Sequence, residues 1–216
     1  KASLEPKDID LLIFSGASFD YPIPHNSVII KSKITTDEVN FQCFDVDSTC
    51  LSFMNALDIA QLYLQAGRYK RIAIVTSEIA SIALTPNDEK VFGLFGDAAV
   101  AIILESSLTN GFTQTFAHFK NYPSGALQAS VHIGGALNRG IGAPIFDKGY
   151  YFNMDGKGMI RLIQKHFDGF INEMKAQTNN CIKDFDAIII HQTSRYGNEF
   201  FMENYHPRIE QMLNTL

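Results

Sequence analysis

The most constraining feature of this sequence is an apolar segment at residues 51–66, which directly follows a short polar turn containing Cys50. Apolar side chains cover most of its circumference at helical spacing, and only a narrow polar stripe interrupts them. A helix that is apolar nearly all round is normally buried inside a sizeable domain. The segment therefore predicts a central helix of a layered fold, with Cys50 at its amino end.

Cys50 has two interpretations at this position. The free backbone N–H groups and the dipole of a helix N-terminus lower the pKa of a thiol, which favours a nucleophile. Free cysteine is also among the most buried residue types, and Cys50 would then be a packed core residue. The stretch by itself supports both interpretations equally.

Short apolar segments alternate with helical stretches along the chain, and this order predicts an α/β fold with a largely parallel sheet. Strands are expected at residues 9–14, 41–46, 71–78, 95–104 and 186–190, with another near 111–119. Helices are expected at residues 30–34 and 51–66, after residue 157, and from 197 to 216. Residues 106–150 form a long irregular region, and such regions are usually functional or mobile.

Charge and cysteine content exclude several classes of function. A net charge of −5 argues against nucleic acid as the main partner. Cys43, Cys50 and Cys181 have no CxxC spacing and the histidines share no metal-ligand spacing, so neither a disulfide framework nor a metal site is indicated. A cytoplasmic setting is the simplest fit. No apolar run reaches membrane-spanning length, and no dinucleotide fingerprint is present.

Residues 8–18 and 184–194 share a pattern, 176 positions apart. Each begins with Asp-x-Asp, continues as an apolar strand and ends in serine. If the two halves of the chain are structural copies, the counterpart of the Cys50 turn would lie near position 226, past the last residue. The chain would then stop short of half of its own site.

His191 follows one expected strand as Cys50 follows another. Functional groups collect at the carboxyl ends of strands in parallel α/β sheets. A cysteine near a histidine is the arrangement of thiol catalysis, because imidazole can hold or pass the proton. The alternative is a histidine that caps its strand and is satisfied by backbone groups. Glu78, at a third strand end, is expected to be a buried polar anchor.

Four motifs resemble, in order and spacing, those of the β-ketoacyl-acyl-carrier-protein synthase III family. The segment Phe44-Asp45-Val46-Asp47-Ser48-Thr49-Cys50-Leu51-Ser52-Phe53 resembles its nucleophile segment, and Phe95-Gly96-Asp97-Ala98-Ala99 its glycine-aspartate turn. Met154-Asp155-Gly156-Lys157 resembles the Met-x-Gly lead into a helix, and His191-Gln192-Thr193-Ser194 the His-Gln-Ala-Asn motif. The resemblance extends over almost the whole chain.

The resemblance implies a thiolase-like fold, which is a duplicated αβαβα layered architecture with mostly parallel sheets and buried central helices, usually in a homodimer. Residues 1–105 would form the N-terminal half without its first strand and helix, and residues 106–216 an incomplete C-terminal half. The chain is therefore expected to be the middle part of a longer protein, incomplete at both ends.

The resemblance also implies an activity, the decarboxylating Claisen condensation of an acyl thioester with a malonyl thioester. Cys50 would carry the acyl group, and His191 would donate a hydrogen bond to the malonyl thioester carbonyl. Ile23 would reach into the acyl tunnel of the partner subunit, and Arg195 lies one position before the family's carrier-binding arginine. The implied substrates are acyl-coenzyme A or acyl-carrier protein and malonyl-acyl-carrier protein, with no cofactor and no metal, in fatty acid or polyketide synthesis.

The chain departs from the family pattern at several positions. Ser52 replaces a glycine two residues after the cysteine, and Ser194 replaces the asparagine of the histidine motif. The family's catalytic asparagine belongs to a Gly-Asn-Thr segment after the helix that is expected to end at Leu216. Two alternatives therefore stay open: an acyltransferase or head-to-head condensing enzyme without decarboxylation, and a non-catalytic thiolase-like subunit that binds a catalytic partner.

Overall fold

The computed structural model describes residues 3–106, 116–144, 146–192 and 195–212. The chain forms two compact units, of which the first comprises residues 1–82 and 96–115 and the second residues 83–95 and 116–216. The segment 83–95 thus lies with the second unit, although it precedes the boundary expected at residue 105. The assignment of the two units as copies of one half-fold stays a prediction.

The first unit is built on a four-stranded sheet with strand order β2-β1-β3-β4. Its strands are β1 (Leu11–Ser15), β2 (Gln42–Val46), β3 (Arg71–Glu78) and β4 (Ala98–Glu105). Strand β1 pairs in parallel with both β2 and β3, and β4 pairs antiparallel with β3. The prediction of a mostly parallel sheet is confirmed, and these four strands overlap the segments expected from the sequence.

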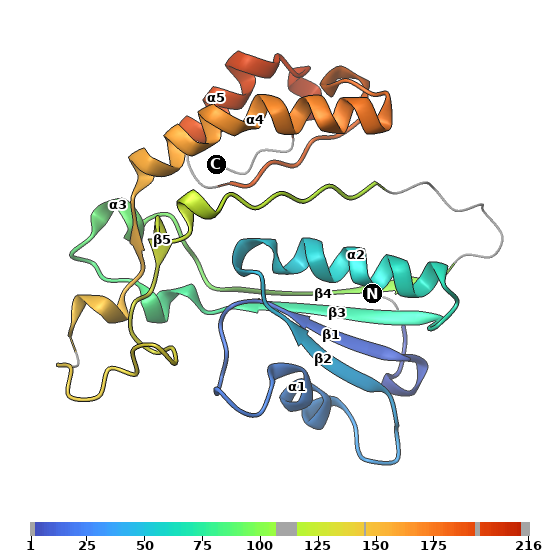
Figure 1. The fold of residues 1–216 in the computed structure, drawn as a ribbon. Helices are drawn as coiled ribbons and strands as arrows, with labels where there is room; N and C mark the ends of the chain where they lie inside the picture. Colours follow the sequence, from blue (N-terminus) through green and yellow to red (C-terminus); the bar gives the residue numbers. More distant parts are fainter. Residues whose placement is uncertain (1–2, 107–115, 145, 193–194, 213–216) are drawn as a thin grey trace. The chain divides into compact units, whose positions relative to one another are not determined.

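Helices cover both faces of this sheet. Helix α2 (Ser52–Gln65) lies along one face and α1 (Asn26–Ile34) along the other (Figure 1). Successive side chains of a strand point to opposite faces, so Leu11 and Ile13 join the core beneath α2 while Leu12 and Phe14 point the other way. The result is an α/β/α sandwich around the central strand.

Helix α2 packs through a face of small residues. Ser52, Ala56, Ala60 and Leu64, spaced four apart, are the buried residues of α2. Small side chains let the helix approach the sheet closely. The expectation of a helix buried on all sides holds for this face only. The opposite side of α2 carries two exposed apolar side chains, Met54 and Leu62.

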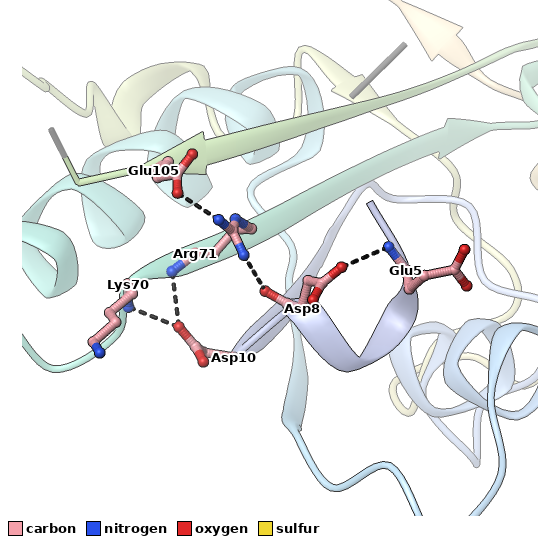
Figure 2. Close-up of polar contacts among 6 residues, drawn as sticks. All are labelled: Glu5, Asp8, Asp10, Lys70, Arg71 and Glu105. Atoms are coloured by element: carbon pink, nitrogen blue, oxygen red, sulfur yellow. Dashed lines mark hydrogen bonds and ion pairs between the residues drawn. The ribbon is translucent and has the colours of Figure 1, made fainter. Parts of the chain in front are cut away.

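A polar network closes the amino end of the central strand (Figure 2). The Asp10 carboxylate accepts the backbone N–H groups of Lys70 and Arg71 at 2.7 and 2.8 Å. The Arg71 guanidinium donates to the Asp8 carbonyl and to the Glu105 carboxylate. These bonds tie the starts of β1 and β3 and the end of β4 together.

The second unit contains the helices α3 (Glu89–Phe92), α4 (Gly156–Thr178) and α5 (Arg195–Tyr205) and a two-stranded sheet of β5 (Ala129–Ser130) and β6 (Asn153–Met154). Asp155 caps α4 by accepting the N–H of Gly158. Phe167 of α4 packs edge-on against Phe201 and Tyr205 of α5. Short 3-10 helices complete both units, at Pro6–Asp8, Thr49–Leu51, Ala80–Ala83, Pro123–Gly125, Lys148–Tyr150, Ile182–Asp184 and Ile209–Gln211.

Three sequence predictions for the second unit need correction or limits. The segment 186–190 forms one isolated bridge, between Ile188 and Met212, in place of the expected strand. Helix α5 ends at Tyr205 and does not continue toward residue 216. The strand expected near 111–119 falls largely outside the described residues, and its described part, 116–119, has no regular structure.

Candidate functional site

Cys50 lies on a sharp turn between β2 and α2. It belongs to the 3-10 helix Thr49–Leu51, which ends where α2 begins, so Cys50 precedes the α-helix proper. Thr49 has a φ of 51°, a left-handed conformation that is uncommon for a β-branched residue. The Asp47 carboxylate accepts the Thr49 N–H at 2.9 Å, and the Ser48 carbonyl accepts the Leu51 N–H at 3.1 Å. Hydrogen bonds within residues 47–51 thus fix the conformation of the turn that carries the Cys50 thiol.

The Cys50 thiol has a raised pKa. Partial burial of the side chain raises the pKa above its usual value, and the negative charge of Glu78 raises it further, whereas a hydrogen bond from the cysteine's own N–H lowers it. The lowering of the pKa that the nucleophile interpretation expects at a helix N-terminus is thus outweighed by desolvation, and the role of Cys50 as a nucleophile stays a prediction. The residue as a whole is exposed, and the net effect on its thiol favours the protonated form. Attack by this sulfur needs a base.

Glu78 is an anchor at the end of β3, as predicted, although it is half-buried. Its carboxylate accepts the Ala17 N–H at 2.8 Å and the Ser18 hydroxyl at 2.7 Å. A Cβ on Gly16 would lie 2.9 Å from a Glu78 oxygen, so glycine permits this close approach. The carboxylate therefore ties the loop after β1 to the end of β3, and its negative charge acts on the Cys50 thiol.

Asp97 of the glycine-aspartate motif, like Glu78, connects two segments through hydrogen bonds to its carboxylate. Its carboxylate accepts the Ser81 hydroxyl at 2.6 Å and the Ser81 N–H at 2.9 Å. These bonds lower the pKa of Asp97 below its ordinary value. The motif therefore joins the start of β4 to the 3-10 helix Ala80–Ala83.

Ile23 lies on the turn between β1 and α1 and is 85% exposed. Such exposure of a large apolar side chain suits contact with another surface. Its role toward a partner's acyl tunnel stays a prediction.

His191 borders an apolar cavity within the second unit. The cavity has a volume of about 450 Å³ and is lined mainly by faces of α4 and α5. Its lining includes Met154, Met159, Ile160, Ile163, Phe167 and Phe200. A concave, mostly apolar space with a few polar side chains at its wall, here His191, Gln164 and Tyr196, is the usual form of a small-molecule site. The sequence showed the apolar face of α4, but not that α5 would leave a cavity against it.

Gln192, the residue after His191, is hydrogen-bonded to other residues of the second unit. The Gln192 amide donates to the Ile190 carbonyl at 3.1 Å and accepts a hydrogen bond from the buried Asn198 of α5 at 3.1 Å. Thr193 and Ser194 of the motif lie outside the described residues. Arg195, at the start of α5, is exposed and forms an i,i+4 ion pair with Glu199 at 2.7 Å. The carrier-binding role of Arg195 stays a prediction.

The structure places the predicted site residues in two separate groups. Cys50 and Ile23 belong to the first unit, and His191 and Arg195 to the second. A shared cavity for Cys50 and His191 stays a prediction. Among the residues that the structure describes, no group of His, Cys, Asp and Glu side chains could hold a metal ion. None of the described helices combines the length and the hydropathy needed to span a membrane.

The family model and the similar sequences that comparison finds all describe the same kind of protein. Residues 44–122 match the family described as 3-oxoacyl-[acyl-carrier-protein (ACP)] synthase III. The chain is 28% identical over 193 residues to a β-ketoacyl-[acyl-carrier-protein] synthase III of Haemophilus influenzae, a match covering 89% of this chain and 57% of that protein. It is 26% identical over 215 residues to the same-named protein of Histophilus somni, covering 100% of this chain and 64% of that one. The chain thus spans about six tenths of these relatives.

Solved structures share the fold. A crystal structure of a 3-oxoacyl-(acyl-carrier-protein) synthase III superposes with a TM-score of 0.85 at 15% identity, covering 99% of this chain and 66% of that one. The priming β-ketosynthase of the R1128 polyketide pathway gives a TM-score of 0.78 at 20% identity, covering 99% and 62%. At these identities the likeness establishes the fold alone.

Proposed function

Because the chain is related to the β-ketoacyl-acyl-carrier-protein synthase III family and has its thiolase-like α/β fold, we propose that it forms the central part of a decarboxylating condensing enzyme. The reaction joins an acyl thioester to a malonyl thioester and gives a β-ketoacyl thioester through an acyl-cysteine. The observation that carries the proposal is the position of Cys50 on a sharp turn directly before α2. His191, which borders an apolar cavity of the second unit, would complete the site.

In the first half-reaction, the Cys50 sulfur attacks the carbonyl of the acyl thioester. A new carbon–sulfur bond forms, the bond to the carrier thiol breaks, and the proton of Cys50 passes to the leaving thiolate. Since burial raises the pKa of the Cys50 thiol and so favours its protonated form, this transfer needs an acceptor, and His191 is the candidate. The Cys50 N–H would stabilise the developing oxyanion.

In the second half-reaction, the malonyl thioester loses carbon dioxide, and its carbanion attacks the acyl group on Cys50. Negative charge builds on the malonyl thioester carbonyl before the new carbon–carbon bond forms. A hydrogen bond from His191 would stabilise that charge. The apolar cavity beside His191 would hold an uncharged part of a thioester substrate away from water.

The proposal includes the partners of the reaction. Acyl-coenzyme A or acyl-carrier protein would supply the primer and malonyl-acyl-carrier protein the extender, with no further cofactor. Ile23, 85% exposed, would shape the acyl site of a second copy in a homodimer, and Arg195 would contact the carrier. Three free cysteines fit a cytoplasmic location.

Acyl transfer to Cys50 is tested with radiolabelled acyl-coenzyme A and the natural gene product that contains this chain. The parent should retain label on the peptide containing Cys50. Cys50→Ala should lose it completely, and Cys43→Ala, which alters a half-buried cysteine of β2, should keep it. His191→Ala should slow malonyl-dependent carbon dioxide release by at least about a hundredfold, the usual contribution of a positioned acid or base.

The outcomes separate the competing functions. Label on Cys50 without malonyl-dependent carbon dioxide release identifies an acyltransferase or head-to-head condensing enzyme that does not decarboxylate. Undiminished label in Cys50→Ala contradicts the proposal, because the acyl group is then carried elsewhere. No label in the parent also contradicts it and favours a non-catalytic subunit.

A further inference from the structure

The hydroxyl of Ser52 bridges the two residues that precede Cys50. It accepts the Ser48 N–H at 2.8 Å and donates to the Thr49 carbonyl at 2.6 Å. Ser52 is 2% exposed, so water is a poor substitute for either bond. A glycine at this position could make neither of them. The turn of residues 48–52 is therefore closed by a side chain that belongs to α2.

The turn needs this support because of its backbone conformation. Thr49, immediately before the thiol, has a φ of 51°, and a β-branched residue keeps such a conformation only when its surroundings hold it. Asp47 accepts the Thr49 N–H, and the Thr49 hydroxyl donates to the Ser48 carbonyl at 2.8 Å. Both of these bonds lie on the β2 side of the turn. The Ser52 backbone N–H also donates to the Thr49 carbonyl, and the Ser52 hydroxyl adds the two side-chain bonds that connect the turn to the buried face of α2.

We propose that Ser52 is a positioning residue for Cys50, whose hydroxyl holds the strained 48–52 turn so that the thiol and its backbone N–H keep a fixed direction. The catalytic consequence of this position rests on the proposed function of Cys50, whereas the geometric effect concerns the thiol of this chain whatever it reacts with. Ser52 acts through the turn and does not itself contact the reacting atoms.

The test measures iodoacetamide alkylation of Cys50 against pH, mapped by peptide mass spectrometry, with Cys43 of β2 as internal reference. Ser52→Ala should free the turn, relieve the burial of the thiol and move the midpoint of the Cys50 profile to lower pH, so that alkylation near pH 7.5 becomes about threefold faster. The rate at Cys43 should not change. Ser15→Ala, which removes another buried hydroxyl of the same unit, should leave both rates at parent values.

A second variant keeps the proposal testable if Ser52→Ala opens the whole unit. Glycine adopts positive φ freely, so Thr49→Gly combined with Ser52→Ala should return the Cys50 profile toward that of the parent. An unchanged Cys50 profile in Ser52→Ala would overturn the proposal. So would an equal rise at Cys50 and Cys43 that the double variant does not reverse, because the effect would then be general unfolding.

This result is independent of acyl transfer. A parent that takes no acyl label but shows the selective Ser52 effect contradicts the proposed function and leaves the positioning role standing. If the parent takes the acyl label but Ser52→Ala leaves its Cys50 profile unchanged, the result supports the proposed function and contradicts the positioning role of Ser52.

Discussion

Residues 5–15 and 181–191 both contain the Asp-x-Asp pattern and the apolar run after it, and they begin in the same way. Each starts with a 3-10 helix, Pro6–Asp8 or Ile182–Asp184, whose last residue is an aspartate. The Asp8 carboxylate accepts the Glu5 N–H at 2.8 Å, and the Asp184 carboxylate accepts the Cys181 N–H at 2.6 Å. Turns of this kind form from a few neighbouring residues, and the shared pattern accordingly gives shared geometry.

The two segments differ as soon as the strand should begin. Strand β1 lies between β2 and β3, and Ile13 at its centre is 0% exposed. Its counterpart Ile189 is 78% exposed, beside the isolated bridge of Ile188 to Met212. A strand is completed by neighbours on its edges, since its backbone groups bond to other segments. An apolar run can thus form a strand, but it does so only where neighbouring segments supply hydrogen-bond partners for its backbone.

The two regions also agree in connectivity. In the first unit, α1 follows β1 and leads to the parallel neighbour β2, where Leu12 pairs with Cys43. In the second, α5 follows the 186–190 segment, and Ile188, the counterpart of Leu12, bridges in parallel to Met212. This repetition of turn, extended segment, helix and parallel partner supports the proposal that the units are copies of one half-fold.

The largest expected difference is at the matched isoleucines. Ile13→Ala removes a fully buried side chain and should lower the free energy of unfolding of the first unit by about 2–5 kcal/mol. Ile189→Ala alters an exposed side chain and should change that of the second unit by less than about 0.5 kcal/mol. Hydrogen exchange of β3 and α4 peptides in denaturant reports the two units separately. Similar costs at both positions would show that 186–190 is a buried strand in solution.

An intermediate effect is expected at the second aspartate of each pattern. Asp10→Ala leaves the N–H groups of Lys70 and Arg71 without their acceptor (Figure 2) and should cost about 1–3 kcal/mol in the first unit. Asp186 is exposed, and Asp186→Ala should cost far less. Denaturant titration of both variants checks the difference. A cost at Asp186 equal to that at Asp10 would make the two strand starts equivalent and remove the contrast.

The smallest effect is a pH dependence of the second turn. Hydrogen bonds from the Cys181 thiol and backbone N–H lower the pKa of Asp184 below its usual value of 3.8. A carboxyl whose pKa is lower in the folded state stabilises the fold above its unfolded pKa, and this stabilisation is lost as pH falls through the folded pKa. Asp184→Asn should therefore destabilise the second unit slightly near pH 7, and the difference from the parent should vanish as pH falls below 3.8. A difference that persists at low pH, or one matched by the exposed control Asp37→Asn, would refute the assignment.

Local features of the site were predictable because they depend on neighbouring residues. The spacing of apolar residues and the polar residues between apolar runs predict three of them: the turn before α2, the strand at residues 71–78 and the anchor at Glu78. The raised pKa of Cys50 was not predictable, because it reflects burial and a charge 28 positions away in the chain. The cavity beside His191 likewise depends on how α4 and α5 meet.

The sequence by itself determined which segments turn, which can extend, and that Cys50 and His191 each follow an apolar run, since these properties come from side-chain type and spacing. Only the tertiary structure decided that residues 11–15 become a central strand while residues 186–190 make one bridge, and that Ser52 closes the turn beneath the thiol. Such outcomes depend on burial and on hydrogen bonds to distant or folded-back groups, which no local pattern encodes.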